Sequence, residues 1–274
     1  MLILSHIRCF VLDMDGTVYL GDRLLPGALE FFEYLRNTGR DFLFLTNNSS
    51  RHAESYAKKL AHLGIACQAG SILTSGEATA FYLNTIKKNA RVFLLGTPEL
   101  EEEFRRQGFT LTEESPDFVV LGFDQTLTYA KLVTACNLIR GGIPFVATHP
   151  DLNCPTESGY IPDCGAMTAL ISAATGVKPK VIGKPNREII DLILRKKAYA
   201  PHQLAIVGDR LYTDMAAGIN AGICTVLVLS GETKPADLAA ASLQPAYICR
   251  DLAELTELLR QHDEKSSRLS VPSS

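Results

Sequence analysis

The stretch CFVLDMDGTVYLG, residues 9–21, joins a short apolar run to a turn that carries two carboxylates. Its first four residues are apolar and predict a buried strand, and Asp13 and Asp15 follow before Gly16. Acidic side chains after a buried strand either open a turn or take part in a site at the end of the strand. The remaining sequence decides between these two interpretations.

The composition is that of a globular protein with a small-molecule partner. The 274 residues are 46% hydrophobic and 21% charged, and a formal net charge of −3 at pH 7 without a block of like charges argues against nucleic acid and membrane as partners. The start, MLILSHIRCFVL, contains His6 and Arg8 and predicts a strand instead of a signal peptide; no apolar run reaches transmembrane length. Seven cysteines, an odd number, favour free thiols and a cytoplasmic location. The sequence leaves open whether the chain forms a homo-oligomer.

Short apolar runs alternate with helical patterns along the chain. The runs lie at residues 7–12, 41–46, 91–96, 117–123, 144–148, 180–183, 204–209, 224–230 and 246–249. A helix is predicted over residues 26–38, with Pro26 in its first turn and Ala28, Leu29, Phe32 and Leu35 on one face. This alternation predicts an α/β protein with a mostly parallel sheet, in which ligands bind at the carboxyl ends of the strands.

Polar residues follow three more of these runs. They are Thr46, Asn47 and Asn48 after one run, Lys184 after the second, and Asp209 with Asp214 after the third. Singly, each has an ordinary explanation as a turn residue, a helix cap or a solvated lysine. Together, at the ends of separate strands of one sheet, they favour a single site.

These residue types suit the hydrolysis of a phosphate ester. An anionic nucleophile and a phosphate monoester repel each other by about 4 kcal/mol per pair of unit charges at 4 Å and an effective dielectric constant of 20, so cations are needed. Lys184 supplies one, and Asp13 and Asp209 offer the oxygen ligands that Mg²⁺ prefers. Asp13 can attack phosphorus, and Asp15 can protonate the leaving alcohol and later activate water.

The segments DMDGT, LTNNSS, GKPN and GDRLYTD, in this order, resemble the four motifs of the haloacid dehalogenase (HAD) superfamily, and most closely its NagD-like class IIA phosphatases. The resemblance covers residues 7–260 and implies a Rossmann-like parallel-sheet core with an inserted α/β class II cap domain. It implies Asp13 as nucleophile, Asp15 as acid and base, and Lys184 as the residue that neutralises the phosphate. The implied phosphate-binding residues are Thr46, Asn47 and Asn48. The implied Mg²⁺ ligands are Asp13, Asp15 through its backbone carbonyl, Asp209, and Asp214 in a supporting position.

The spacing of the motifs locates the cap. Thr46 and Lys184 lie 138 positions apart, far more than a crossover needs, so we expect an inserted domain at residues 78–179 between core segments 1–77 and 180–262. Residues 263–274 read as a polar, solvated tail. After Asp15, residues 18–25 predict a small hairpin that turns at Gly21 and Asp22.

Substrate choice is expected in the cap, at residues 147–166, ATHPDLNCPTESGYIPDCGA. Its candidate substrate-binding residues are His149, Asp151 and Cys154. A zinc site is disfavoured, because Cys154 and Cys164 are ten positions apart and the sequence has no Cys-x-x-Cys pair.

The sequence thus predicts a Mg²⁺-dependent phosphomonoester hydrolase that forms an aspartyl-phosphate and acts on a nucleoside monophosphate or a sugar phosphate. Phosphoglycolate and 4-nitrophenyl phosphate remain alternative substrates. A non-enzymatic phospho-acceptor module is the competing class of function, but it needs neither the large insertion nor the acid at position 15. A phosphomutase of the superfamily would carry its cap between the first two motifs, and a dehalogenase would lack Asp15.

Overall fold

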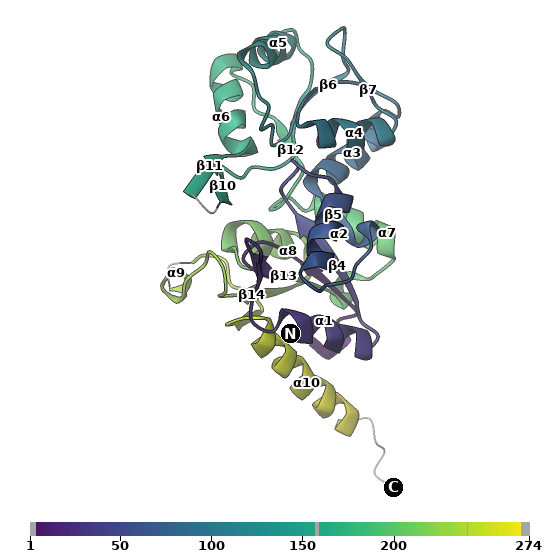
Figure 1. Ribbon diagram of the computed structural model, residues 1–274, viewed down its shortest axis with the longest axis vertical. Helices are drawn as coiled ribbons and strands as arrows, with labels where there is room; N and C mark the ends of the chain where they lie inside the picture. Colours follow the sequence, from purple (N-terminus) through teal and green to yellow (C-terminus); the bar gives the residue numbers. More distant parts are fainter. Residues whose placement is uncertain (1–3, 157–158, 240, 270–274) are drawn as a thin grey trace. The chain divides into compact units, whose positions relative to one another are not determined.

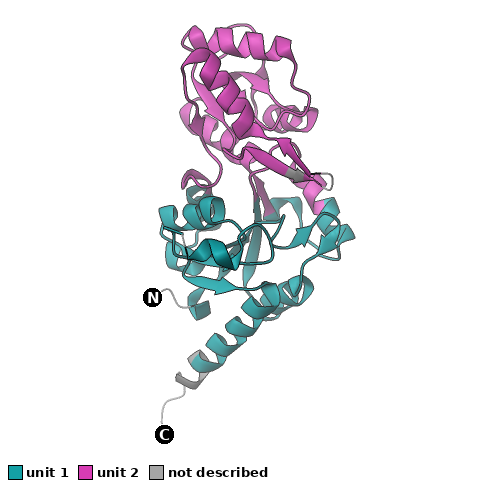
Figure 2. Ribbon diagram, turned by 90° about the vertical axis from the view of Figure 1, so that its left-hand side faces the viewer, with its two compact units in different colours: residues 1–45, 58–71, 190–274 teal, residues 46–57, 72–189 magenta. Residues whose placement is uncertain are grey.

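The computed structural model describes residues 4–156, 159–239 and 241–269, and it is a mixed α/β structure with parallel sheets, as predicted (Figure 1). Each of the nine apolar runs contains a strand. The chain divides into two compact units (Figure 2). The first comprises residues 1–45, 58–71 and 190–274, and the second comprises residues 46–57 and 72–189.

A parallel sheet with the strand order β15-β14-β13-β1-β4 forms the centre of the first unit. Its strands are β1 (Cys9–Leu12), β4 (Asp41–Thr46), β13 (Leu204–Gly208), β14 (Cys224–Val228) and β15 (Tyr247–Cys249). Every residue of β1, β13 and β14 is buried, as is typical of central strands in a parallel sheet. The register pairs Leu12 with Val207, so the residues that follow β1 and β13 emerge side by side.

Helix α1 (Ala28–Asn37) starts two residues after Pro26, which we expected in its first turn. Its buried face includes Phe31, whereas Leu29, predicted on that face, is 51% exposed. The reason is geometric: a helix turns by about 100° per residue, so Leu29 lies about 100° around the axis from Ala28, outside the narrower stripe formed by the buried residues. The other helices of the first unit are α8 (Ala216–Ala221), α9 (Pro235–Leu238) and α10 (Leu252–Leu269).

Helix α10 continues into the predicted polar tail. We expected a solvated tail from residue 263, but the helix extends to Leu269. Asp263 accepts hydrogen bonds from two guanidinium nitrogens of Arg40, at 2.6 and 2.8 Å, and from the hydroxyl of Tyr34. The Arg40 side chain is only 6% exposed. Asp263, which we expected in the solvated tail, therefore neutralises a nearly buried positive charge.

A second parallel sheet, with the order β12-β9-β8-β6-β7, forms the centre of the second unit. Its strands are β6 (Arg91–Leu95), β7 (Thr110–Leu111), β8 (Phe118–Leu121), β9 (Phe145–Ala147) and β12 (Lys180–Val181). The helices of this unit include α3 (Ser75–Ile86), α4 (Pro98–Arg106), α5 (Tyr129–Arg140) and α6 (Cys164–Thr175). Helices α5 and α6 lie side by side, and Arg140 donates to the carbonyl of Ala174 at 2.7 Å (Figure 1). The predicted cap, residues 78–179, lies inside this unit, and its limits remain a prediction.

Several short elements complete the fold. Strands β2 (Tyr19–Leu20) and β3 (Arg23–Leu24) pair as the predicted hairpin. A second hairpin was not predicted; it consists of β10 (Asn153–Thr156) and β11 (Gly159–Pro162). Nor was the strand β5 (Ile72–Thr74) predicted. The remaining elements are α2 (Ala53–His62), α7 (Glu188–Lys197), η1 (Leu4–His6), η2 (Ala69–Ser71), η3 (Pro201–Gln203) and the π-helical turn η4 (Leu211–Met215).

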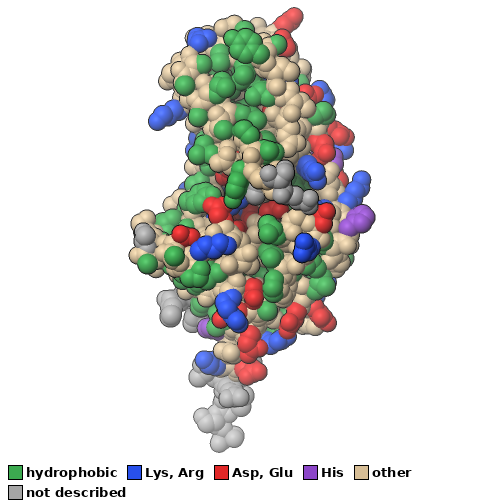
Figure 3. Space-filling model, turned by 60° about the vertical axis from the view of Figure 1, so that its left-hand side comes forward, with side chains coloured by type: hydrophobic (Ala, Val, Ile, Leu, Met, Phe, Trp, Pro, Cys, Tyr) green, Lys and Arg blue, Asp and Glu red, His purple; other side chains and the backbone are tan. Residues whose placement is uncertain are grey.

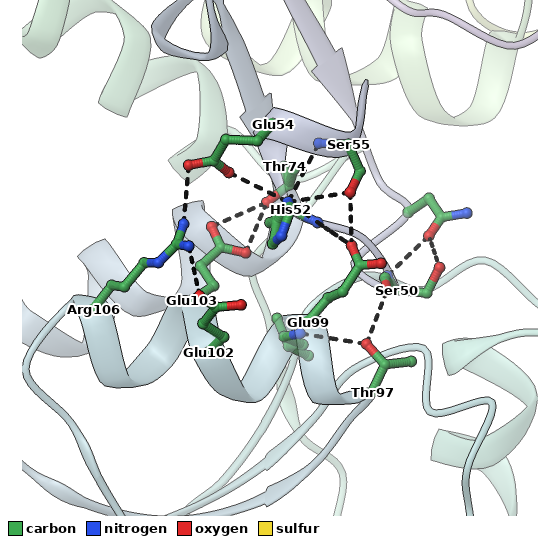
Figure 4. A network of polar contacts seen from close by, with 12 residues as sticks. Ser50, His52, Glu54, Ser55, Thr74, Thr97, Glu99, Glu102, Glu103 and Arg106 are labelled. Atoms are coloured by element: carbon green, nitrogen blue, oxygen red, sulfur yellow. Dashed lines mark hydrogen bonds and ion pairs between the residues drawn. The ribbon is translucent and has the colours of Figure 1, made fainter. Parts of the chain in front are cut away.

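Polar side chains tie the amino end of α2 to α4 within the second unit (Figure 4). Glu99 accepts hydrogen bonds from the backbone nitrogen of His52 and from the hydroxyl of Ser55, both at 3.1 Å. Arg106 forms an ion pair with Glu54 at 2.9 Å. These contacts explain why a short segment from the first half of the sequence belongs to the second unit.

On the face drawn in Figure 3, Lys and Arg side chains are scattered among Asp and Glu without a continuous basic patch among the residues shown in colour. Among residues 4–156, 159–239 and 241–269, no helix has the length and apolar character needed to cross a membrane.

Candidate active site

Two neighbouring strands of the first unit deliver the predicted nucleophile and a predicted metal ligand. Asp13 follows β1 directly and its backbone nitrogen donates to the carbonyl of Val207 in β13 at 2.9 Å. Asp209 follows β13 directly and is buried. The parallel register therefore places the two acids next to each other, as the sequence analysis expected from strand ends.

A third acid joins them from the π-helical turn η4. Asp214 is fully buried and accepts a hydrogen bond from the backbone nitrogen of Arg210 at 3.2 Å. Asp13, Asp209 and Asp214 each offer a carboxylate oxygen, and these oxygens all lie within 4.8 Å of one another. Three ionised carboxylates at this spacing repel each other by about 3 kcal/mol per pair at an effective dielectric constant of 20. A hard divalent cation such as Mg²⁺ removes that repulsion, and an all-oxygen donor set fits it.

The loops after β1 and β14 hold Asp209 in place. Gly16 has a φ of 86°, and a Cβ atom there would lie 2.4 Å from Oδ2 of Asp209, so this position requires glycine. The same Oδ2 accepts a hydrogen bond from the backbone nitrogen of Glu232 at 2.6 Å. Ser230 in turn donates to the carbonyl of Gly16 at 2.8 Å. The metal-ligand candidate is thus fixed from two sides by backbone.

Arg210 and Glu232 were missed by the sequence analysis. They form an ion pair at 2.9 Å, and the Arg210 side chain is 16% exposed. Burial disfavours the guanidinium charge, but the carboxylates of Asp13, Glu232 and Asp209 outweigh it, so the pKa of Arg210 is raised. A signal was present, because Arg210 stands inside the segment GDRLYTD, directly after Asp209.

Asp15, the predicted acid and base, lies in the turn between β1 and the β2–β3 hairpin. Its backbone forms an isolated bridge with Tyr19, and Gly16 donates to the carbonyl of Tyr19 at 2.8 Å. Asp15 is half-buried, as is Asp13. The hairpin therefore fixes the backbone of the second acid of the opening motif.

The predicted phosphate-binding residues lie in the second unit and are mostly buried: Thr46 is 6% exposed, Asn47 5% and Lys184 2%. Thr46 Oγ1 accepts a hydrogen bond from the backbone nitrogen of Asn48 at 3.1 Å. Asn48 Oδ1 accepts from the backbone nitrogen and the hydroxyl of Ser50, at 2.9 and 2.7 Å, so its side chain shapes the turn.

The side-chain amide of Asn47 forms hydrogen bonds with the backbone of Lys184. The backbone nitrogen of Lys184 donates to Asn47 Oδ1, and Asn47 Nδ2 donates to the carbonyl of Lys184, both at 2.9 Å. Asn47 Nδ2 also donates to Oδ1 of Asp151 at 3.1 Å. The structure thus brings together two residues of the predicted phosphate site and one of the predicted substrate loop.

The other two residues predicted for the substrate loop differ in accessibility. Cys154 is half-buried in β10, opposite Ile161 of β11. His149 is fully buried, with Nε2 at 2.8 Å from Asp163 Oδ1 and Nδ1 at 2.9 Å from the hydroxyl of Thr148. Both ring nitrogens of His149 therefore have protein partners, which suits a structural role in the loop better than direct substrate contact. The sequence analysis missed Asp163, although it stands in the quoted loop.

The loop at residues 147–166 contains two cysteines, Cys154 and Cys164. All seven cysteines of the chain are free thiols. Cys164 is buried and donates to the carbonyl of Leu121 at 3.5 Å, and burial raises the pKa of its thiol to about 12.

Family models match both parts of the chain that carry the predicted motifs. A model described as haloacid dehalogenase-like hydrolase matches residues 10–110. A second model, for HAD-hydrolase-like proteins, matches residues 181–255.

Two curated proteins are similar over nearly their whole length. An acid sugar phosphatase of Staphylococcus saprophyticus is 36% identical over 259 residues, which are 94% of this chain and 100% of that protein. The 5′-nucleotidase YutF of Bacillus subtilis is 36% identical over 245 residues, covering 89% of this chain and 96% of that protein.

Solved structures agree with this similarity. A 4-nitrophenylphosphatase from Thermotoga maritima superposes with a TM-score of 0.91 and 49% identity, covering 93% of this chain and 98% of that chain. A glycerol phosphate phosphatase from Mycobacterium tuberculosis in complex with magnesium superposes with a TM-score of 0.88 and 33% identity, covering 93% of this chain and 78% of that chain.

Proposed function

Because the chain belongs to the haloacid dehalogenase-like hydrolases, in which it is a NagD-like phosphoric monoester hydrolase, we propose that it uses Mg²⁺ and forms an aspartyl-phosphate on Asp13. The observation that supports this most is the cluster of Asp13, Asp209 and Asp214, whose oxygens lie within 4.8 Å of one another. These three carboxylates would hold Mg²⁺, together with the backbone carbonyl of Asp15. Bound there, the ion would offset the negative charge of nucleophile and substrate.

Two carboxylates carry the chemical steps of the proposed reaction. Asp13 attacks phosphorus, and the bond between phosphorus and the leaving oxygen breaks as Asp15 donates its proton to that oxygen. Asp15, now ionised, removes a proton from water, and the water oxygen attacks the phosphorus of the aspartyl-phosphate. The bond to Asp13 breaks, so inorganic phosphate and free Asp13 are the products, and Asp15 is protonated again.

The second unit supplies the proposed groups for the phosphoryl oxygens. Lys184 contributes a fixed positive charge, and Thr46 and the segment that follows it contribute hydroxyl and amide donors. Asn48 orders that segment through Ser50.

We propose a small phosphorylated metabolite as substrate, either a sugar phosphate or a nucleoside monophosphate. The names of the two curated relatives, an acid sugar phosphatase and a 5′-nucleotidase, support these two classes. Phosphoglycolate and 4-nitrophenyl phosphate remain alternatives, and the latter is supported by the name of the Thermotoga protein. Asp151 and Cys154 in the loop 147–166 are proposed to discriminate between them, in the cytoplasm, where free cysteines persist.

A phosphate-release screen over a panel of phosphomonoesters tests this proposal. The panel contains sugar phosphates, nucleoside monophosphates, phosphoglycolate and 4-nitrophenyl phosphate, each assayed with Mg²⁺ and with excess chelator. We expect turnover of at least one metabolite class that stops in chelator. Undiminished turnover in chelator would exclude the role of Mg²⁺.

A further inference from the structure

The side-chain amide of Asn47 bonds to both backbone polar groups of Lys184, as a neighbouring strand does in a sheet. Its side-chain oxygen accepts from the Lys184 nitrogen and its side-chain nitrogen donates to the Lys184 carbonyl, both at 2.9 Å. The two residues are 5% and 2% exposed, so water does not replace either bond when it is lost. The position of the Lys184 backbone therefore depends on the orientation of one amide group.

Asp151 fixes that orientation. An amide nitrogen has two hydrogens, and those of Asn47 are directed to the carbonyl of Lys184 and to Oδ1 of Asp151, the latter at 3.1 Å. A carboxylate accepts only, so it cannot pair with the amide in its flipped orientation, in which the oxygen would face Asp151. The oxygen and both hydrogens of the Asn47 side-chain amide thus bond to protein groups. This amide therefore serves to hold neighbouring residues, whereas the sequence analysis expected it to bind the phosphate directly.

The surrounding backbone leaves this arrangement little freedom. A Cβ atom on Gly183 would lie 2.7 Å from Asn47 Oδ1 and 2.7 Å from the carbonyl of Thr148, so only glycine permits the close approach. Gly183 also donates to that carbonyl at 2.8 Å, and Gly165, at the amino end of α6, donates to the carbonyl of Asp151 at 2.8 Å. The loop that carries Asp151 and the segment that carries Lys184 are therefore held against the same amide.

We propose that Asn47 is a positioning residue for Lys184 and that Asp151, through Asn47, sets the affinity for the phosphoryl group. This inference rests on the proposed function, in which Lys184 neutralises the phosphate. It changes the expected role of the substrate loop: Asp151 acts on the part of the substrate that all phosphate esters share, and not only on the leaving group.

Inorganic phosphate is the probe that separates these roles, because it has no leaving group. Its inhibition constant is measured against hydrolysis of a small ester in the presence of Mg²⁺. Asp151→Ala removes the acceptor and should raise the inhibition constant for phosphate by about tenfold, the effect expected for one hydrogen bond to a charged group. Asp151→Asn keeps an oxygen that can accept from Asn47 and should stay within about threefold of the wild type.

A double-mutant cycle tests the link between the two side chains. Asn47→Asp places a second carboxylate against Asp151 and removes the donor to Lys184, so we expect the inhibition constant to rise by about 100-fold. Adding Asp151→Asn restores a donor opposite the new carboxylate and should recover about tenfold of the loss. Asn84→Asp is the matched control, because Asn84 also donates to a backbone carbonyl in the second unit, that of Gln107, at 3.1 Å, but outside the proposed site. It should leave the inhibition constant unchanged.

Two results would overturn the inference. The first is an unchanged inhibition constant in Asp151→Ala together with altered substrate ranking, which would confine Asp151 to the leaving group. The second is strict additivity of Asn47→Asp and Asp151→Asn. If Asn47→Asp does not fold, the comparison of Asp151→Ala with Asp151→Asn decides alone. A wild type that neither hydrolyses the ester nor binds phosphate would refute the proposed function, and the inference with it.

Discussion

Replacing Glu103 by glutamine should stabilise the protein, and increasingly so as the pH rises. Glu103 lies on α4 and is 8% exposed. Burial raises the pKa of its carboxyl from 4.5 to about 8. The negative charges of Glu77 and Glu54 add to this increase, and the positive charge of Arg106 opposes it. Its carboxyl oxygens lie 3.4 Å from the hydroxyl of Thr74 (Figure 4). Between these two pKa values the folded protein keeps a proton that the unfolded chain releases.

The sign and size of the effect follow from this difference. An acid whose pKa is raised by folding contributes no penalty below pH 4.5, and the free energy of unfolding then falls by about 1.4 kcal/mol per pH unit until the pH passes the folded pKa. At pH 7 the cost is therefore about 3 kcal/mol. Thr74 caps the amino end of α3, whose dipole favours the ionised form by up to about 1 kcal/mol, which leaves a net cost of about 2 to 3 kcal/mol.

Denaturant unfolding of wild type and Glu103→Gln at pH 5, 7 and 8.5 measures this effect. Glutamine has the same shape and does not titrate, so the variant should match the wild type near pH 5 and exceed it by about 2 to 3 kcal/mol at pH 7. Glu102→Gln, at the neighbouring exposed position, is the control and should show no such pH dependence. A difference of the same size at pH 5 and pH 8.5 would refute the assignment of the buried proton to Glu103.

Three further outcomes can be checked directly. Asp13→Asn should abolish both turnover and phosphoenzyme formation. Asp15→Asn should lower turnover by about 10² to 10⁴-fold but should still form a phosphoenzyme from an ester with a good leaving group, and rapid quenching detects this intermediate. Equal amounts of trapped phosphoenzyme in both variants would mean that the two roles are wrong. Asp263→Asn should lower the free energy of unfolding by about 2 kcal/mol, because Arg40 then lacks its anionic partner, and unchanged denaturation midpoints would exclude that role. Cys154→Ser should reorder the substrates in the phosphomonoester panel more than it changes hydrolysis of 4-nitrophenyl phosphate, and uniform losses would count against a specificity role.

The sequence was most informative where the chain is buried on both sides. The central strands β1, β13 and β14 are continuous apolar runs because helices cover parallel sheets on both faces, so composition alone predicts them. The short strands β5 and β7, of three and two residues, were not predicted. The tail from residue 263 was predicted as solvated because its composition is polar, whereas the ion pair of Asp263 depends on a contact with Arg40, 223 positions away.

Strand ends also account for the acidic cluster of the candidate site. Acids at the ends of adjacent strands must meet, so the cluster of Asp13 and Asp209 follows from the register of β1 and β13. Periodicity does not reveal that His149 is buried, because a polar residue in a Pro-rich loop looks solvent-exposed. Nor does it reveal Arg210, since its position depends on its ion pair with Glu232 from a separate loop.

The membership of residues 46–57 in the second unit matters for any attempt to exchange caps between related enzymes. A transplant cut at residues 78 and 179 would carry over Thr148 and Phe123 but leave behind Ser49, whose hydroxyl lies 3.0 Å from that of Thr148 and accepts from the nitrogen of Phe123 at 2.9 Å. In such a chimera, the residues of the transplanted domain at the positions of Thr148 and Phe123 would contact segment 46–57 of the recipient protein instead of their own. A chimera that keeps both contacts of Ser49 therefore requires a second, discontinuous graft of about a dozen residues, 46–57.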